Sequence, residues 1–325
     1  MKTRRWLISL LLVIGCNLPP DLPRDYFYGE DTTVCVAARP LTLTTDLTFE
    51  VDVMQLTGFS KDYTLEYLDS ASISFTGTGQ YVVESITEIT MPLRPAGPVA
   101  VLLDQSGTYA NVDSSNFRSK QLNQFIHELP APGQFILGGF AQDGLLADSP
   151  VEFGTPSFTT DGDGIMPFLF GLSKRTGGKS VVYDAVASTV NLFSAGSNRS
   201  LLLLAHDGDS VSTGTITTAV NAALAQSVRV DVIFMGDRSE AQTLTPLSQA
   251  TGGVFVTCTS DLNMVTAFNH LNNINSGKPY LFRVKVRFTP PSPLMSGQDT
   301  FHEMVIHDSI SDTDYNPVSI YIRTP

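Results

Sequence analysis

The stretch Val99-Ala-Val-Leu-Leu-Asp104-Gln-Ser106-Gly-Thr108 decides the fold of the central part of this 325-residue chain. Its run of apolar residues predicts a strand buried on both faces, as in a parallel sheet. The strand ends in an Asp-x-Ser-x-Thr segment. In an open α/β sheet, ligands bind outside the carboxyl ends of the strands. One carboxylate and two hydroxyls at alternate positions can converge there on a hard cation such as Mg²⁺.

Strands and helices alternate at short spacing through the rest of the central region. Further strands are predicted over 134–140, 151–153, 200–205, 230–235 and 254–257. Helices are predicted over 115–129, after Asp161, near 183–193, and over 216–226, 240–250 and 262–272. This alternation predicts a doubly wound, mainly parallel α/β domain over residues 97–276.

The two flanking segments have the period-2 pattern of half-buried strands instead. Such strands are predicted over 47–53, 71–75, 81–83, 280–288, 301–306 and 318–322. Residues 33–96 and 277–325 are each small for a stable sheet on their own. We therefore expect them to pair into one antiparallel β-sandwich, with the α/β domain inserted between them. Two separate small β units are the alternative.

The N-terminus has the features of an export signal. Three of its first five residues are basic, and the apolar run over 6–14 is too short to span a bilayer as a mature helix. The sequence Val13-Ile14-Gly15-Cys16 resembles a bacterial lipobox, which implies removal of residues 1–15 and lipidation of Cys16. An ordinary signal peptide with an incidental cysteine is the alternative. Residues 16–32 begin with a Pro-rich run and are expected to form a tether.

This N-terminus predicts a lipid-anchored protein of the cell envelope, and the absence of Asp after Cys16 favours the outer membrane or cell surface. The remaining cysteines are Cys35 and Cys258. An exported compartment permits a disulfide between them. Two buried thiols are the alternative, because the geometry that decides between these states is not visible in a sequence.

Composition restricts the partners of this chain. It is 42% hydrophobic, which is enough for a sizeable core, and its formal net charge is −12. An acidic surface repels nucleic acids and anionic membranes. Nucleic acid is therefore not expected as a partner, and contact with a membrane is expected only through the N-terminal lipid.

Four segments together resemble the von Willebrand factor A-type domain. The loop at Asp104 resembles the Asp-x-Ser-x-Ser element of the family's metal-ion-dependent adhesion site. The segment Gly177-Gly-Lys-Ser-Val-Val-Tyr-Asp-Ala185 resembles the Gly-Gly-Thr-x-Leu-Tyr-Asp-Ala element of bacterial members. The strand end Leu201-Leu-Leu-Leu-Ala-His-Asp-Gly-Asp209 resembles Leu-Leu-Thr-Asp-Gly-x-Asp, and Ala250-Thr-Gly-Gly-Val-Phe255 resembles the segment before the last strand. The resemblance covers roughly residues 97–275, and the motifs agree in order and spacing.

The resemblance implies a site for Mg²⁺, or for Mn²⁺ or Ca²⁺, whose open coordination position takes an Asp or Glu of a partner protein. The implied metal residues are Asp104, Ser106, Thr108, Ser180 and Asp207. Thr108 stands where the family has Ser, and Ser180 where it has Thr, so both keep a hydroxyl. Lys179 would compete with a cation if it pointed inward. Thr176 could take the place of Ser180 if the loop is shifted.

Other motifs have simpler interpretations. Asp161-Gly-Asp-Gly164 lacks the downstream Glu of a calcium loop, so we interpret it as an acidic helix start. The segment 177–180 lacks the leading Gly of a phosphate loop. No catalytic constellation stands out. We therefore expect a metal-dependent adhesion or assembly protein. The alternatives are a structural envelope subunit with a degenerate metal site and, less expected, an enzyme.

Overall fold

The computed structural model describes most of the chain from residue 47 onward. The described residues are 47–53, 70–88, 97–108, 117–130, 133–141, 149–172, 174–175, 177–196, 198–236, 240, 243–258, 261–275, 282–296, 298–308, 313–314 and 318–323. The predicted signal peptide, Cys16 and the tether lie outside them, as does Cys35, so the lipid anchor and the disulfide remain predictions. Among the described residues, no helix has both the length and the apolar character needed to cross a lipid bilayer.

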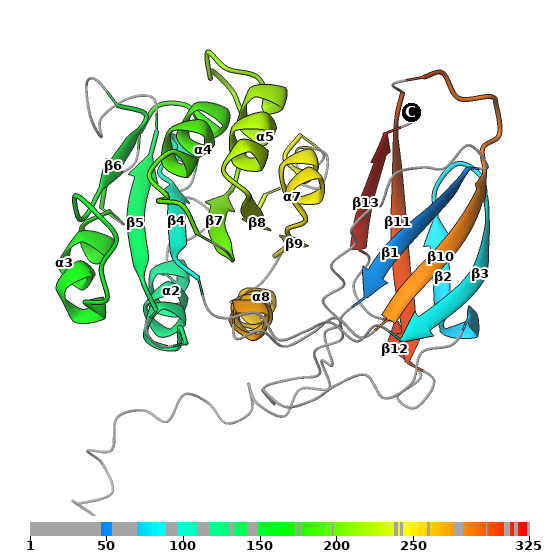
Figure 1. Cartoon of the computed structure of the whole chain (residues 1–325), viewed down its shortest axis with the longest axis horizontal. Coiled ribbons are helices and arrows are strands. Elements are labelled where there is room, and N and C mark those ends of the chain that lie inside the picture. Colours follow the sequence, from blue (N-terminus) through cyan, green and yellow to red (C-terminus); the bar gives the residue numbers. More distant parts are fainter. Residues whose placement is uncertain are drawn as a thin grey trace, which may run out of the picture. The chain divides into compact units, whose positions relative to one another are not determined.

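A six-stranded sheet in the order β6-β5-β4-β7-β8-β9 forms the centre of the α/β domain (Figure 1). Its strands are β4 (Val99–Asp104), β5 (Phe135–Phe140), β6 (Val151–Phe153), β7 (Arg199–Ala205), β8 (Val228–Phe234) and β9 (Phe255–Thr257). All neighbours pair in parallel except β5 and β6. This is the doubly wound order, in which the chain moves outward first on one side of its first strand and then on the other. The predicted α/β fold class is thus confirmed.

The position of β4 beside β7 creates the switch point of this sheet. The chain leaves β4 toward β5 on one side, and later leaves β7 toward β8 on the other. Val99 pairs with Ser200 and Leu103 with Leu204 across the two strands. The loops that follow β4 and β7 therefore diverge at the carboxyl edge, which is where ligands bind in sheets of this kind.

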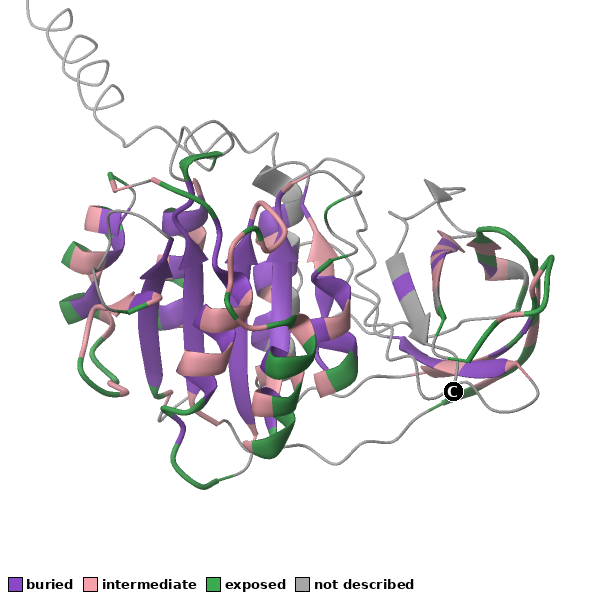
Figure 2. Cartoon of the chain, turned by 90° about the horizontal axis from the view of Figure 1, so that it is seen from above, coloured by how far each residue is buried: buried purple, intermediate pink, exposed green. Residues whose placement is uncertain are grey.

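Two layers of helices cover the sheet. The helices are α2 (Phe117–His127), α3 (Gly162–Leu172), α4 (Val182–Val190), α5 (Ile216–Ala225), α7 (Thr245–Thr251) and α8 (Asp261–Asn275). Buried side chains of α2, α3 and α8 pack in one core cluster, and those of α4, α5 and α7 in the other. The sheet between them is buried on both faces, as Figure 2 shows, which explains the unbroken apolar run of β4.

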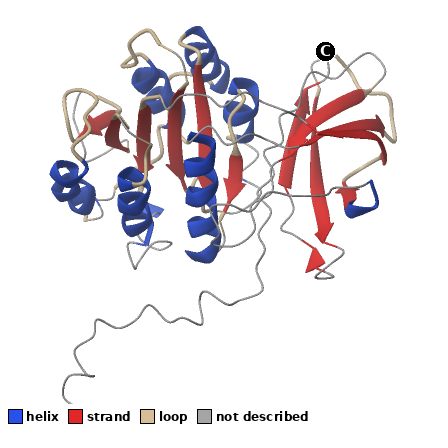
Figure 3. Ribbon diagram, turned by 60° about the horizontal axis from the view of Figure 1, so that its bottom comes forward, coloured by secondary structure: helices blue, strands red, loops and turns tan. Residues whose placement is uncertain are grey.

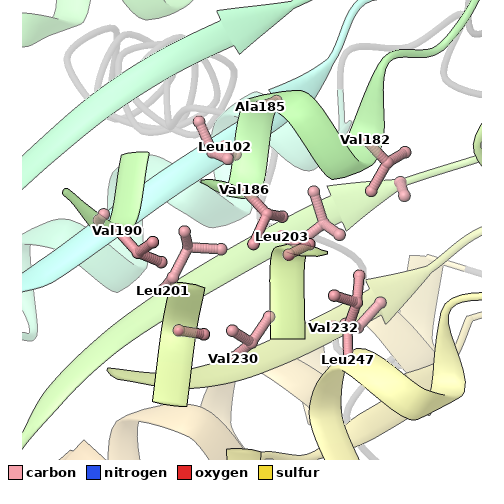
Figure 4. Close-up of a cluster of buried hydrophobic side chains, with 14 of the residues drawn as sticks. Leu102, Val182, Ala185, Val186, Val190, Leu201, Leu203, Val230, Val232 and Leu247 are labelled. Carbon is pink, nitrogen blue, oxygen red and sulfur yellow. The ribbon is translucent and has the colours of Figure 1, made fainter. Parts of the chain in front are cut away.

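The second core cluster shows how alternate side chains of one strand pack on opposite faces of the sheet. Leu201 and Leu203 of β7 point to the same face because side chains alternate along a strand. They meet Val182, Val186 and other residues of α4, together with Val230 and Val232 of β8 (Figure 4). Leu202 and Leu204 belong to the opposite cluster.

The flanking segments form two antiparallel sheets (Figure 3). One has the order β1-β10-β3, and in the other β11 pairs with β2, β12 and β13. The strands are β1 (Thr48–Val53), β2 (Ile73–Thr76), β3 (Gln80–Glu88), β10 (Phe282–Thr289), β11 (Asp299–Asp308), β12 (Thr313–Asp314) and β13 (Val318–Arg323). N-terminal strands thus pair with C-terminal strands in both sheets, and both contribute to one core. The structure confirms the joint sandwich over two separate β units.

The predicted elements differ from the observed ones mainly at their ends. The helix predicted over 240–250 is described as α7, which begins at Thr245 with Pro246 in its first turn. Proline is favoured there because its missing N–H is not needed at a helix start. A short 3-10 turn, Ser70–Ser72, precedes β2, and the two-residue β12 was not predicted.

Candidate metal centre

The candidate site lies at the switch point between β4 and β7. Asp104 is the last residue of β4, and Asp207 follows the end of β7 by two residues. The loop after β4 carries Ser106 and Thr108, and Ser180 lies two residues before α4. The site therefore takes its side chains from three loops that meet at one edge of the sheet.

Asp104 lies at the buried end of the site. Its side chain is fully buried, and its Oδ1 accepts a hydrogen bond from the Ser106 backbone N–H at 2.8 Å. Its Oδ2 accepts one from Ser180 Oγ at 3.1 Å. Burial raises the pKa of this carboxyl, while the hydrogen bonds from Ser106 and Ser180 and the charge of Arg118 oppose that rise.

A chain of hydroxyl contacts leads from Asp104 to the surface. Ser106 Oγ lies 3.2 Å from Thr108 Oγ1, and Thr108 Oγ1 donates a hydrogen bond to Asp207 Oδ2. Together with the bond between Ser180 and Asp104, these contacts join all five predicted site residues into one continuous chain of contacts. Ser106 stands in the middle of this chain, because its backbone N–H bonds Asp104 and its hydroxyl contacts Thr108.

The segment before α4 is held against the β4 loop by backbone bonds. Gly107 N–H donates to Gly178 O at 3.0 Å, and Gly177 N–H donates to Gln105 O at 2.9 Å. This pairing places Ser180 in the interior, whereas the neighbouring Lys179 is exposed. Ser180 thus reaches the Asp104 carboxylate from the interior. Thr176, the alternative, lies outside the described residues.

Arg118, which the sequence analysis did not single out, lies directly beneath the β4 loop. Only 2% of this residue is exposed, and its Nη1 donates to the backbone oxygen of Asp104 at 2.7 Å. Its Nη2 reaches the side-chain oxygen of Gln105 at 2.9 Å when that amide is oriented to satisfy its neighbours. A basic residue near the start of a predicted helix carries no sign of burial, so this role could be found only in three dimensions.

His206 also contacts the site. Its Nδ1 lies 2.9 Å from Asp207 Oδ1, so the two oxygens of Asp207 face a ring nitrogen and the Thr108 hydroxyl. The acidic segment at Asp161 has a different role: Asp161 Oδ1 accepts the Gly164 N–H at 2.8 Å at the start of α3. That contact agrees with the interpretation of this segment as a helix start.

The chemistry of the site suits a hard divalent cation. Two carboxylates and three hydroxyls bear the oxygen atoms of this site, and each of these side chains lies within hydrogen-bonding distance of another member of the set. Mg²⁺, Mn²⁺ and Ca²⁺ prefer such donors, and Mg²⁺ keeps several waters. Among the described residues, no group of three or more His, Cys, Asp or Glu side chains is placed to hold a metal. The candidate set therefore depends on its hydroxyls.

Comparison with known proteins gives similarities in solved structures only. No protein-family model matches the chain, and no curated protein does. A von Willebrand factor type A protein from Catenulispora acidiphila is 11% identical, with a TM-score of 0.49 over 79% of this chain and 76% of that one. The conserved hypothetical protein BatB from Bacteroides thetaiotaomicron is 16% identical, with a TM-score of 0.45 over 56% and 99% of the two chains. The ArnB paralog VWA2 from Sulfolobus acidocaldarius is 12% identical, with a TM-score of 0.44 over 78% and 76%.

Proposed function

We propose that the α/β domain is of the von Willebrand factor A type and that its carboxyl-edge site binds a divalent cation, preferably Mg²⁺ or Mn²⁺. Through that cation it would bind an Asp or Glu side chain of a partner protein. The observation that carries the proposal is the convergence of five oxygen-bearing side chains from three separate loops at the switch point of the sheet. The residues that would hold the ion are Asp104, Ser106, Thr108, Ser180 and Asp207.

The exposure of these side chains supports a site that is open on one side. Asp104, Ser106 and Ser180 are buried, whereas Thr108 is exposed and the Asp207 side chain is 21% exposed. A closed structural site would bury all of its donors. The partner's carboxylate would therefore approach from the side of Thr108 and Asp207.

The charge balance supports an acidic ligand. The site has two carboxylates, and the buried guanidinium of Arg118 lies against the backbone of one of them. With a bound divalent cation, the charges of the two carboxylates, of Arg118 and of the ion would sum to about +1, which favours an outside carboxylate at the open coordination position. A partner with an acidic side chain fits this balance better than a basic or apolar one.

We propose binding rather than catalysis for this site. The hydroxyls of Ser180 and Thr108 face the carboxylates Asp104 and Asp207. His206, the imidazole beside the site, contacts Asp207. These oxygen-bearing side chains would suit the coordination of a hard cation.

We further propose that the protein is exported and anchored to the cell envelope by a lipid on Cys16, with the lipid as its only contact with the membrane. The partner would then be another envelope or surface protein. A second candidate is a structural envelope subunit with a metal-free site. It is favoured by one observation: the bonds from Ser180 to Asp104 and from Thr108 to Asp207 satisfy the site's own carboxylates.

Titration of Mn²⁺ into the purified full-length protein, followed by electron paramagnetic resonance, tests the proposal. We expect saturable binding that Mg²⁺ displaces and that Asp104→Ala and Thr108→Ala each weaken strongly. Thr108 is exposed, so its variant guards against a loss caused by misfolding. Asp163→Ala is the matched control, because this carboxylate lies on α3 with its side chain 97% exposed.

A second arm tests the partner. Immobilised protein is incubated with an envelope extract in Mg²⁺, and bound proteins are eluted with chelator. We expect proteins that the wild type retains, that chelator releases and that the Asp104→Ala variant does not retain. Absence of Mn²⁺ binding by the wild type, or equal binding by both site variants, would overturn the metal-dependent function in favour of the metal-free structural role.

A further inference from the structure

Helix α4, which follows Ser180 in the chain, does not cap its own N-terminus. Its N-cap residue is Val181, which has no side chain able to accept a hydrogen bond. The first amides of a helix need acceptors from elsewhere. The Tyr183 N–H finds one in another loop: it donates to Asp209 Oδ1 at 3.1 Å.

Asp209 belongs to the loop after β7, two residues beyond Asp207. Its Oδ2 also accepts the Ser212 N–H at 3.2 Å, and its Oδ1 accepts the Ser212 hydroxyl. Asp209 therefore serves as the cap of α4 while it shapes its own loop. A negative charge at this place also interacts favourably with the helix dipole.

A second carboxylate makes the same connection in the opposite direction. Asp184, in the first turn of α4, accepts the Thr213 N–H at 2.8 Å and its hydroxyl at 3.0 Å through Oδ2. Its Oδ1 accepts the Gly214 N–H at 2.9 Å. Ser212 links the two residues, because its Oγ accepts the backbone N–H of Asp184 at 3.1 Å and donates to the carboxylate of Asp209.

We propose that Asp184 and Asp209 form a reciprocal clamp that holds the loop of Ser180 and the loop of Asp207 in a fixed relative position. A backbone bond from Ser210 N–H to Ser180 O, 3.1 Å long, lies between the two halves of this clamp. We assign the clamp residues a positioning role, because each of their four carboxylate oxygens accepts a backbone N–H of α4 or of the loop after β7.

The consequence for the metal rests on the proposed function. Ser180 and Asp207 come from loops on either side of the clamp, so their separation depends on it. Groups that orient metal ligands without touching the metal change affinity by about 10- to 100-fold when they are removed. The clamp therefore sets how well the site is organised before a cation arrives.

The first test compares Mn²⁺ affinity in wild type, Asp184→Ala, Asp209→Ala and the double variant, with Asp163→Ala as the control for loss of an acidic residue in the first turn of a helix. We expect about 10- to 100-fold weaker binding in each single variant, with the double variant little worse than either, because the two residues act as one unit. Asp209→Asn should retain more affinity than Asp209→Ala, since an amide oxygen can still accept the Tyr183 N–H.

A metal-free measurement makes the clamp testable on its own. Hydrogen exchange in chelator should become faster at the amides of Tyr183, Ser210, Thr213 and Gly214 in the Asp209→Ala variant. Exchange in the central strands should stay unchanged, which distinguishes loosened loops from general destabilisation.

The outcomes separate the two proposals. Weaker Mn²⁺ binding together with locally faster exchange supports the clamp. Unchanged affinity in both single variants, when the wild type binds Mn²⁺, overturns it. If the wild type binds no Mn²⁺, the proposed function fails and exchange alone decides: faster exchange confined to the two loops supports the clamp, and unchanged exchange rejects it.

Discussion

Ser180 Oγ donates a hydrogen bond to Asp104 Oδ2 at 3.1 Å, although the two residues are 76 positions apart in the sequence. Both side chains are completely buried. Burial disfavours the charged form of a carboxyl, so each donor that faces it stabilises the folded state. This bond ties the segment before α4 to the end of β4.

Replacing Ser180 by Ala should destabilise the metal-free protein by about 1–3 kcal/mol, because a buried carboxylate oxygen loses its donor. The pKa of Asp104 should rise further, since the lost bond is one of the contacts that lower it. Urea unfolding at pH 7 in chelator measures the change. Ser180→Thr, which keeps the hydroxyl, should lie close to wild type. Equal stability of the Ala variant and wild type would contradict a role for this bond.

A buried histidine makes the sandwich sensitive to acid. His302 is 1% exposed and packs against Phe49 and Phe288, with Tyr81 Oη and Thr300 Oγ1 at its two ring nitrogens. Burial lowers the pKa of His302 from 6.5 to about 4. Burial also raises the pKa of Tyr81 to about 12, so the phenol does not titrate in the same range.

The free energy of unfolding should therefore fall as the pH falls from about 6.5 to about 4. In this window the unfolded chain binds a proton at His302 that the folded chain does not, and above pH 6.5 the contribution to stability is complete. The shift corresponds to about 3 kcal/mol over the whole window. Urea unfolding at pH 7, 6 and 5 should give a shallower pH dependence for His302→Gln than for wild type. Parallel curves would show that His302 is not the group responsible.

Core packing against α4 gives a matched pair of leucine substitutions. Leu203 is fully buried and packs with side chains of α4 (Figure 4). Leu224 of α5, in contrast, is 49% exposed. Leu203→Ala should cost about 2–5 kcal/mol because it removes apolar contacts and leaves a cavity. Leu224→Ala should change stability by less than about 1 kcal/mol. Thermal or urea unfolding of both variants checks this difference, and a similar loss in both would contradict the assigned core.

Gly253 lies where the segment before β9 approaches the backbone of β8 closely. A Cβ at this position would lie 1.9 Å from the Val230 backbone oxygen, so Gly253→Ala must move β8 or the segment before β9. We expect a loss of several kcal/mol, roughly the size of a strained core substitution. Gly171 in α3 is the control, because a Cβ there meets nothing within 4 Å. Gly171→Ala should stabilise by about 0.5–1 kcal/mol through its helix propensity. Equal effects in unfolding experiments would contradict this geometry.

The α/β fold could be predicted because its strands and helices differ in local pattern. The strand predicted over 151–153 is observed as β6, and the helix predicted over 216–226 as α5. Helix ends were less predictable, because they depend on caps that the chain supplies from elsewhere. The helix predicted near 183–193 is α4, which begins at Val182 as expected but ends at Val190. Its cap, Asp209, belongs to a loop that a local pattern cannot connect to it.

The sandwich could be predicted as a class but not in its register. Period-2 patterns placed apolar side chains such as Val51 and Val284 on one face. Their pairing across the two ends of the chain, β1 with β10 and β2 with β11, is a long-range choice. The burial of His302 among aromatic rings follows from that choice and could not be seen in the sequence.

The sequence by itself determined the nature of the site: a strand that ends in Asp104, with Ser106 and Thr108 two and four residues later, because residues so close in a chain share one loop. It also supplied Ser180 and Asp207 as candidates. Only the tertiary structure decided that these five side chains meet, since β4 and β7 become neighbours through parallel pairing of strands that are distant in the chain. The burial of Arg118 depends on the packing of α2 against the sheet, and the clamp of Asp184 and Asp209 depends on the approach of α4 to the loop after β7, so neither could be found from a local pattern.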